Sequence, residues 1–284
     1  MNAHPQSEAE SAAPLYPERA LRLHVLASGS KGNAAIVENT ATGQGILVDC
    51  GICKRDFFAR CSQAAFDPAN LQAILITHDH GDHTKGLGVV CRELARRSMR
   101  PKLFVSTAVR AASKPVAEVL DQGLCEFVAL APNAFDVDDI RIIPFATSHD
   151  AAESFGFRFE VPGDAIGYIT DTGIVPPTAR ELLRDVRILA LESNHDARML
   201  AEGPYPWPIK QRIASEHGHL SNDQASDELA ELLGPRLQTV VAMHISQNNN
   251  TYRAPEQALR EVVTRASHPA AVLVAYQDRL VTVR

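Results

Sequence analysis

One short segment concentrates side chains that bind metals. Residues 78–83 read HDHGDH, so three imidazoles and two carboxylates crowd together directly after the apolar run 73–77. That run predicts a strand in a buried sheet, whose end delivers the segment to the sheet edge. Buried polar groups need compensation, which a divalent metal provides to imidazole and carboxylate ligands, and Gly81 allows the turn that aims them inward. The spacing H-x-H-x-D-H therefore predicts a metal site; the alternative is a polar loop that happens to be rich in histidine.

Four further candidate ligands each stand where a predicted strand ends. They are Asp49, His149, Asp171 and His244. A single His or Asp in such a place is usually a capping or solvated residue. Their recurrence beside the histidine cluster predicts that they converge on the same site.

The elements that must position these residues form two series. Strands are predicted over 23–27, 34–38, 45–49, 73–77, 102–106, 140–147, 155–161, 165–170, 187–191, 238–244 and 271–276, and helices over 87–97, 109–121, 222–233 and 255–265. No long linker or low-complexity segment separates the halves. We therefore expect an α/β (α+β) fold in which two sheets pack face to face with helices outside, an αββα four-layer sandwich in one domain over residues 21–284.

Composition is that of an ordinary soluble globular protein. The chain has 284 residues, of which 45% are hydrophobic and 22% charged, and its formal net charge is −6. Binding of nucleic acid would therefore need a local basic patch. Residues 1–20 are polar and contain three prolines, which predicts a flexible tail without a signal segment. No apolar run approaches the roughly 20 residues of a membrane span, so we expect a cytoplasmic protein.

The five cysteines suit a reducing compartment, because their number is odd and they form no evident disulfide framework. Cys50 and Cys53 make a C-x-x-C pair without a second pair to complete a zinc site. Free thiols are expected, and the role of this pair stays open.

With its five ligand motifs in order, the chain resembles the metallo-β-lactamase fold superfamily of metallohydrolases. The segments 26–33 (LASGSKGN), 192–196 (ESNHD), 218–222 (GHLSN) and 244–246 (HIS) are similar to its YycJ (WalJ)-like branch. Relatives of that branch include nucleases of the ribonuclease Z and ribonuclease J type and small phosphodiesterases.

This resemblance implies a centre of two divalent ions, Zn²⁺ or Mn²⁺. One ion would be held by His78, His80 and His149, the other by Asp82, His83 and His244, with Asp171 bridging them. Asp49 would not bind metal itself but would orient a ligand histidine through the free ring N–H of that histidine. His195 would serve the metal centre in the same indirect way. Two such ions share a hydroxide formed near neutral pH, which attacks the substrate, so Asp82 and Asp171 also count as catalytic.

The bridging aspartate, where lactamases of this fold commonly have cysteine, favours a phosphodiesterase or a thioesterase. We expect a metal-dependent phosphodiesterase or nuclease, exonuclease-like, with DNA or RNA as substrate; the alternative is a glyoxalase II-like thioesterase. A binding module without activity would predict eroded ligands, and every ligand position is filled. The choice of metal, DNA against RNA, and oligomeric state stay open.

Other residues are candidates for proton transfer and substrate binding. His219 precedes a helix opened by the S-x-x-Q capping box of Ser221 and Gln224, and we predict that it donates a proton to the leaving group without binding metal. His195 either lines the cleft or simply ends a strand. The candidate substrate contacts are Lys210 and Arg212, in a basic segment that also holds Trp207, with Ser221, Asn222 and Asn249.

Three arginines recur every four residues, at 92, 96 and 100. They would share one helical face if the helix persisted that far, although Pro101 makes its last turn doubtful. A solvated face is the favoured interpretation, and a track for phosphates is the alternative.

Overall fold

Two seven-stranded sheets form the centre of the molecule in the computed structural model, which describes residues 20–284. In the first sheet the order is β14 (Val281–Val283), β1 (Leu21–Ala27), β2 (Ala34–Asn39), β3 (Gly45–Val48), β4 (Leu71–Leu75), β5 (Lys102–Val105) and β6 (Glu126–Ala129). In the second it is β13 (Ala271–Val274), β12 (Thr239–Met243), β11 (Ile188–Glu192), β10 (Asp164–Ile169), β9 (Phe155–Val161), β8 (Ile140–Ala146) and β7 (Phe135–Val137).

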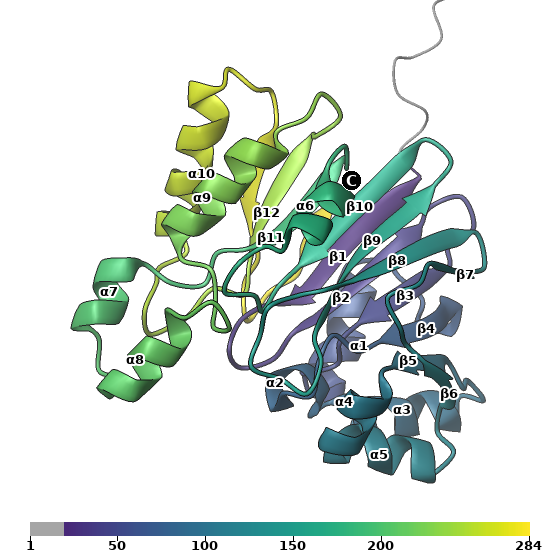
Figure 1. Cartoon of the computed structure of the whole chain (residues 1–284). Helices are drawn as coiled ribbons and strands as arrows, with labels where there is room; N and C mark the ends of the chain where they lie inside the picture. Colours follow the sequence, from purple (N-terminus) through teal and green to yellow (C-terminus); the bar gives the residue numbers. More distant parts are fainter. Residues whose placement is uncertain (1–19) are drawn as a thin grey trace, which may run out of the picture.

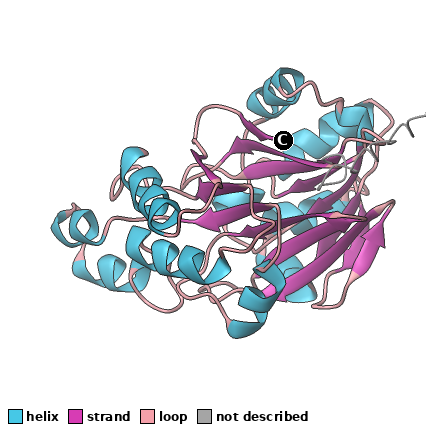
Figure 2. Cartoon of the chain, turned by 90° about the horizontal axis from the view of Figure 1, so that it is seen from above, coloured by secondary structure: helices cyan, strands magenta, loops and turns pink. Residues whose placement is uncertain are grey.

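Helices cover the outer face of each sheet (Figures 1 and 2). Those of the first half are α1 (Lys54–Gln63), the ligand-bearing α2 (Gly81–Thr84), α3 (Leu87–Arg96), α4 (Thr107–Ala112) and α5 (Lys114–Asp121). Those of the second half are α6 (Pro177–Leu183), α7 (Ala197–Glu202), α8 (Trp207–Ile213), α9 (Asn222–Leu232) and α10 (Arg253–Arg265), of which α7 and α8 stand apart at the left of Figure 1. Within residues 20–284, no helix combines the length and apolar character needed to cross a membrane.

Three clusters of buried apolar side chains pack the four layers together. One lies between the sheets and joins Leu23 and Val25 of β1 to Phe157 and Tyr168 of the second sheet. The other two fill the spaces between each sheet and its helices. Both faces of the central strands are therefore buried, which explains why their sequences are apolar throughout rather than alternating.

The predicted αββα sandwich is confirmed, and the predicted strands all form within about two residues of their expected bounds. The predicted tail, residues 1–20, lies outside the described residues except for Ala20. A single domain over 21–284 stays a prediction, which the core shared by both sheets supports.

One helix prediction needs correction. The single helix expected over 109–121 is two helices, α4 and α5, separated at Ser113, where the backbone is extended. Pro115 is the reason: it lacks an N–H, and its ring would clash with the carbonyl four residues earlier in a continuous helix. The helix predicted over 87–97 forms as α3 and ends at Arg96, as the doubt raised by Pro101 indicated. Arg100 therefore does not extend its face and donates to the carbonyl of Gly123 instead.

Candidate metal centre

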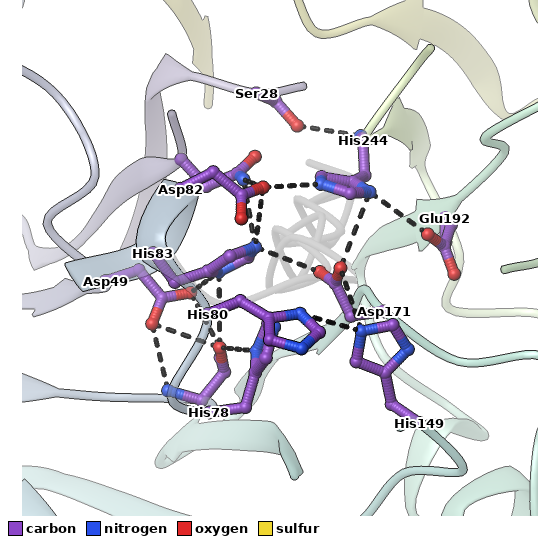
Figure 3. A network of polar contacts seen from close by, with 12 residues as sticks. Ser28, Asp49, His78, His80, Asp82, His83, His149, Asp171, Glu192 and His244 are labelled. Carbon is purple, nitrogen blue, oxygen red and sulfur yellow. Dashed lines mark hydrogen bonds and ion pairs between the residues drawn. The ribbon is translucent and has the colours of Figure 1, made fainter. Parts of the chain in front are cut away.

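The seven predicted metal ligands come together in one cluster, although they belong to four separate segments of the chain (Figure 3). The segment 78–83 runs from the loop after β4 into α2, and His149 lies between β8 and β9. Asp171 and His244 follow β10 and β12, which both pair in parallel with β11. Because parallel strands end at the same edge of a sheet, these two residues meet there.

The backbone at this edge is unusual. Asp49, Asp171 and His244 have φ angles of 60°, 56° and 53°, in the left-handed region that side chains other than glycine rarely adopt. Each residue directly follows its strand or stands one position beyond it. The left-handed turn redirects the chain at the strand end and helps to bring the side chain into the cluster.

Two groups of three ligands can be recognised. In the first, the donor atoms of His78, His80 and His149 lie within 4.8 Å of one another, and His149 Nε2 is 3.2 Å from His80 Nδ1. In the second, Asp82, His83 and His244 meet the same condition, with Asp82 Oδ2 3.5 Å from His83 Nε2 and 3.4 Å from His244 Nε2.

Asp171 lies between the two groups. Its Oδ2 is 3.3 Å from His83 Nε2, and its Oδ1 is 3.8 Å from His149 Nε2. It also forms a candidate ligand group with His78 and His83. One carboxylate thus faces ligands of both groups, as a bridging residue must.

The buried atoms of this cluster are incompletely paired without a cation. His78 Nε2 and Asp171 Oδ2 are buried and have no hydrogen-bond partner among residues 20–284. An unpaired buried polar atom costs about 1–3 kcal/mol. Both atoms are metal donors, and their residues belong to one candidate ligand group with His83. The residues present therefore fit a divalent metal.

The electrostatics of the cluster also favour a cation. Burial acts to lower the pKa of His244, but the neighbouring carboxylates, Asp171 foremost, outweigh it and raise this pKa to about 10. Burial lowers the pKa of His78 well below its usual value, which keeps that imidazole neutral as a metal ligand must be. The carboxylates thus create a negative potential around His244, while His78 is held neutral. A divalent ion is stabilised by the negative potential and can bind the neutral imidazole.

Asp49 occupies the place predicted for it behind the ligands. It is fully buried, its Oδ2 accepts a hydrogen bond from His83 Nδ1 at 2.7 Å, and its Oδ1 accepts from the backbone N–H of Thr77 at 2.9 Å. The Nε2 atom of His83 is thereby left to face Asp82 and Asp171. An aspartate in this position fixes the tautomer and the orientation of a ligand histidine.

Sequence reasoning missed Glu192, the last residue of β11. It is fully buried, and its Oε1 accepts from His219 Nδ1 at 2.8 Å and from His244 Nδ1 at 3.2 Å. Burial acts to raise its pKa, but the charge and hydrogen bond of His219 outweigh this and lower the pKa to about 2. The signal was available, because a lone acid closes an apolar strand here as Asp171 follows one in the neighbouring strand.

His219 is closer to the ligands than the sequence indicated. Its ring centroid is 5.0 Å from that of His149 and 5.2 Å from that of His244. Asp171, Glu192, His219 and His244 form a fourth group with the geometry to hold a metal. The prediction that His219 is a proton donor rather than a ligand therefore remains to be tested by metal content.

A cleft of about 380 Å³ opens onto the cluster. Its lining combines His80, Asp82, Asp171, His219 and His244 with Tyr205, Ile209 and Arg212 from the α8 region. Of the predicted substrate contacts, only Arg212 lines this cleft, where it pairs with Asp150. Lys210 turns away and donates to the carbonyl of Ala201 at 2.7 Å.

The remaining candidates serve internal contacts. Ser221 and Gln224 form the predicted capping box of α9, and Asn222 bonds Ser193 and Asn250. Asn249 and His195 are buried, His195 having its pKa lowered to about 4 chiefly by burial. The structure does not bring these four residues, Ser221, Asn222, Asn249 and His195, to the cleft.

The cysteines do not join the cluster. All five are free; Cys50 is buried and Cys53 exposed. Among residues 20–284, no candidate group of metal ligands includes a cysteine.

Comparison with known proteins assigns the family. Residues 44–245 match the family model of the "Beta-lactamase superfamily domain". The chain is 32% identical over 244 residues to exodeoxyribonuclease YycJ of Bacillus anthracis, covering 86% of this chain and 89% of the relative. It is also 32% identical to exodeoxyribonuclease WalJ of Streptococcus pneumoniae, over 82% of this chain and 84% of that one. The crystal structure of the metallo-β-lactamase fold protein YhfI of Bacillus subtilis superposes with a TM-score of 0.69 at 15% identity, covering 93% of this chain and 99% of that chain.

The chain therefore belongs to the metallo-β-lactamase superfamily, as its motifs predicted, and it is a metallohydrolase. Within the superfamily its sequence is similar to those of the YycJ and WalJ proteins, which confirms the predicted branch.

Proposed function

We propose that this protein is an exonuclease that hydrolyses phosphodiester bonds of DNA with two divalent metal ions. The observation that carries the proposal is the position of Asp171 between two groups of three ligands. The relatives named as exodeoxyribonucleases support DNA as the substrate.

The ligand residues would divide between the two ions as the sequence predicted. His78, His80 and His149 would hold one ion, Asp82, His83 and His244 the other, and Asp171 both. An imidazole-rich set with few carboxylates favours Zn²⁺, with Mn²⁺ as the alternative. When bound, two such ions activate water near neutral pH and neutralise charge on the phosphate.

His219 is the residue that we assign to the departing oxygen. Its Nδ1–H is held by Glu192 at 2.8 Å, which leaves Nε2 as the ring nitrogen that can serve the substrate. The imidazole is partly exposed and lines the cleft. With both ring nitrogens protonated, His219 is a cation that the Glu192 carboxylate stabilises, and it can donate the Nε2 proton to an alkoxide.

Arg212 is the cleft residue that we assign to substrate phosphate. It extends from α8 into the cleft lining, and Asp150 fixes its position. Tyr205 and Ile209 supply apolar surface beside it, against which a base can stack or pack. We also expect the activity to reside in the domain from residue 21 on and to operate in the cytoplasm.

A panel of substrates under defined metals tests this function. The protein is stripped with a chelator, reloaded with Zn²⁺ or Mn²⁺, and assayed on bis-p-nitrophenyl phosphate, on 5′-labelled single- and double-stranded DNA and RNA, and on S-lactoylglutathione. We expect metal-dependent release of mononucleotides from DNA. Faster turnover of S-lactoylglutathione than of every phosphodiester would make the protein a thioesterase instead, and internal cuts in DNA would make it an endonuclease.

A further inference from the structure

A surface rich in cations leads away from the cleft over the outer helices of the first sheet. A hollow of about 580 Å³ between α1 and α3 is lined by Cys53, Lys54, Arg55, Val89, Arg92 and Arg96. The four cations of this hollow are exposed, and no carboxylate residue lines it. The chain as a whole has a net charge of −6, so this hollow is a local basic patch on an acidic protein.

A second hollow adjoins this one and is lined by a residue next to the cleft lining in the sequence. The second hollow, of about 350 Å³, shares Cys53 with the first and also contains the exposed Lys31 and Lys85. Lys31 follows Ser30, which lines the cleft, and Lys85 directly follows the ligand helix α2. We call the six exposed cations the basic track: they are Lys31, Lys85, Lys54, Arg55, Arg92 and Arg96.

Acidic neighbours neutralise only part of the basic track. Glu93 is shared by three cations, at 3.7 Å from Lys54 Nζ, 3.2 Å from Arg96 Nη1 and 3.2 Å from Arg97 Nη2. Arg55 is paired with Asp56, at 2.9 Å between Arg55 Nε and Asp56 Oδ1. In the described part of the chain, Lys31, Lys85 and Arg92 have no ion-pair partner, although Asp56 and Asp278 also line the second hollow. Three of the six cations of the basic track therefore carry a charge that no carboxylate pairs with.

We propose that the basic track binds the sugar-phosphate backbone of the DNA strand that extends beyond the cleft. The inference rests on the proposed exonuclease function and adds where the rest of the substrate lies. Regularly repeated phosphates are the partner that a row of exposed, underpaired cations fits, and the wall of the larger hollow contains no aromatic side chain on which bases could stack. Binding there should therefore depend on salt and not on sequence.

The track variant carries Lys54→Gln, Arg92→Gln and Arg96→Gln. Its matched control carries Lys114→Gln, Arg184→Gln and Arg260→Gln, three exposed cations of other helices that remove the same charge and line neither the cleft nor the two hollows. Affinity is measured by fluorescence anisotropy on metal-loaded protein with nuclease-resistant phosphorothioate single strands of increasing length, at several salt concentrations. Turnover of bis-p-nitrophenyl phosphate and thermal melting report on the cleft and the fold.

For the wild type we expect affinity to rise with strand length and then level off. The track variant should bind a 20-nucleotide strand about tenfold more weakly. The salt slope, which is the slope of log K against the logarithm of the salt concentration, should become less steep by about 2, since each phosphate contact to a single strand contributes about 0.7. Binding of a dinucleotide and turnover of the small diester should change less than about twofold, because both occupy only the cleft. The control should bind like the wild type.

Two results would overturn the proposal. An unchanged salt slope and an unchanged affinity for the long strand would show that the track does not contact DNA, and an equal loss in the control would show an effect of global charge. If the triple variant melts early, Arg92→Gln alone decides, because Arg92 makes no ion pair with any residue from 20 to 284. The salt slope of this single variant should fall by about 0.7. Absence of DNA hydrolysis by the wild type would instead contradict the exonuclease function itself.

Discussion

Replacing Glu192 by Gln should separate proton transfer from metal binding. Glu192 serves two kinds of partner: Oε1 accepts from the rings of His219 and His244, and Oε2 accepts from backbone N–H groups, at 2.9 Å from Thr172 and 3.3 Å from Leu220. Glutamine has almost the same shape but only one oxygen, so its amide can satisfy only one of the two groups. Each broken pairing costs about 1–3 kcal/mol, and the folded state should lose at least about 2 kcal/mol.

The effect on the reaction should exceed the effect on the fold. A protonated His219 loses the carboxylate that stabilises it, so kcat for a thymidine dinucleotide, which releases an alkoxide, should fall by about 10²- to 10⁴-fold. Hydrolysis of bis-p-nitrophenyl phosphate should suffer much less, because p-nitrophenolate departs without a proton. His219→Ala should show the same asymmetry, and the double variant should be no slower than either single one.

Glu192→Gln also removes a hydrogen bond of the candidate ligand His244. Asn194→Ala is the matched control, because it perturbs His244 without removing the partner of His219. Asn194 Nδ2 lies 3.3 Å from His244 Nδ1 and 2.8 Å from its carbonyl. Among the hydrogen bonds of residues 20–284, none joins Asn194 to His219. Metal content is measured for Glu192→Gln, His219→Ala, the double variant and Asn194→Ala. Equal slowing of both leaving groups with metals retained would assign His219 to phosphate binding, and loss of metal from His219→Ala would make this residue a ligand, so that either result refutes the reasoning.

Three further predictions concern the metals, the cleft and the fold. Metal analysis of replete protein should find close to two divalent ions, and Asp171→Ala should lose at least one because this carboxylate faces both groups; a wild type with a single ion would contradict the binuclear assignment. Arg212→Ala should raise KM for DNA by about three- to tenfold while Arg198→Ala, an exposed cation on the neighbouring α7, leaves KM unchanged, and equal effects would remove Arg212 from the cleft's function. Burial acts to raise the pKa of Glu38, but the hydrogen bond and charge of His24 outweigh it and lower this pKa, so the carboxylate stabilises the fold above its ordinary pKa of about 4.3 and less as pH falls through the lowered value. Urea unfolding of Glu38→Gln should therefore show a deficit at pH 7 that shrinks near pH 3, and a deficit independent of pH would contradict this account.

The sequence predicted which residues would come together, because most of the candidate ligands follow a strongly apolar strand. A strand buried on both faces is visible as a continuous run, and a His or Asp after it stands out. Glu192 shows the same signal, because it is an acid at the end of the apolar strand β11. Its role was missed because its contact with His219 joins residues 27 positions apart, which the local sequence does not show.

The elements without a buried face were not predicted. None of the residues of α8 is buried, so the helix has no apolar periodicity to detect, although it supplies Ile209 and Arg212 to the cleft. The short strands β6, β7 and β14 also escaped prediction, because three or four residues with little burial resemble a loop. Pairing with neighbouring strands, which local sequence does not encode, makes them strands.

The left-handed backbone of Asp49, Asp171 and His244 constrains how this sequence can diverge. Each position must satisfy the chemistry of its side chain and also a conformation that disfavours most residues by on the order of 1 kcal/mol. At Asp49 and His244 the buried hydrogen bonds of the side chain offset this cost, whereas the Oδ2 atom of Asp171 has no such bond among the described residues. A gene copy released from catalysis would therefore gain stability by accepting Gly or Asn at position 171, since these residues adopt positive φ most readily. Glycine or asparagine at this strand end is the mark by which a relative that has lost its activity, but kept its fold, can be recognised.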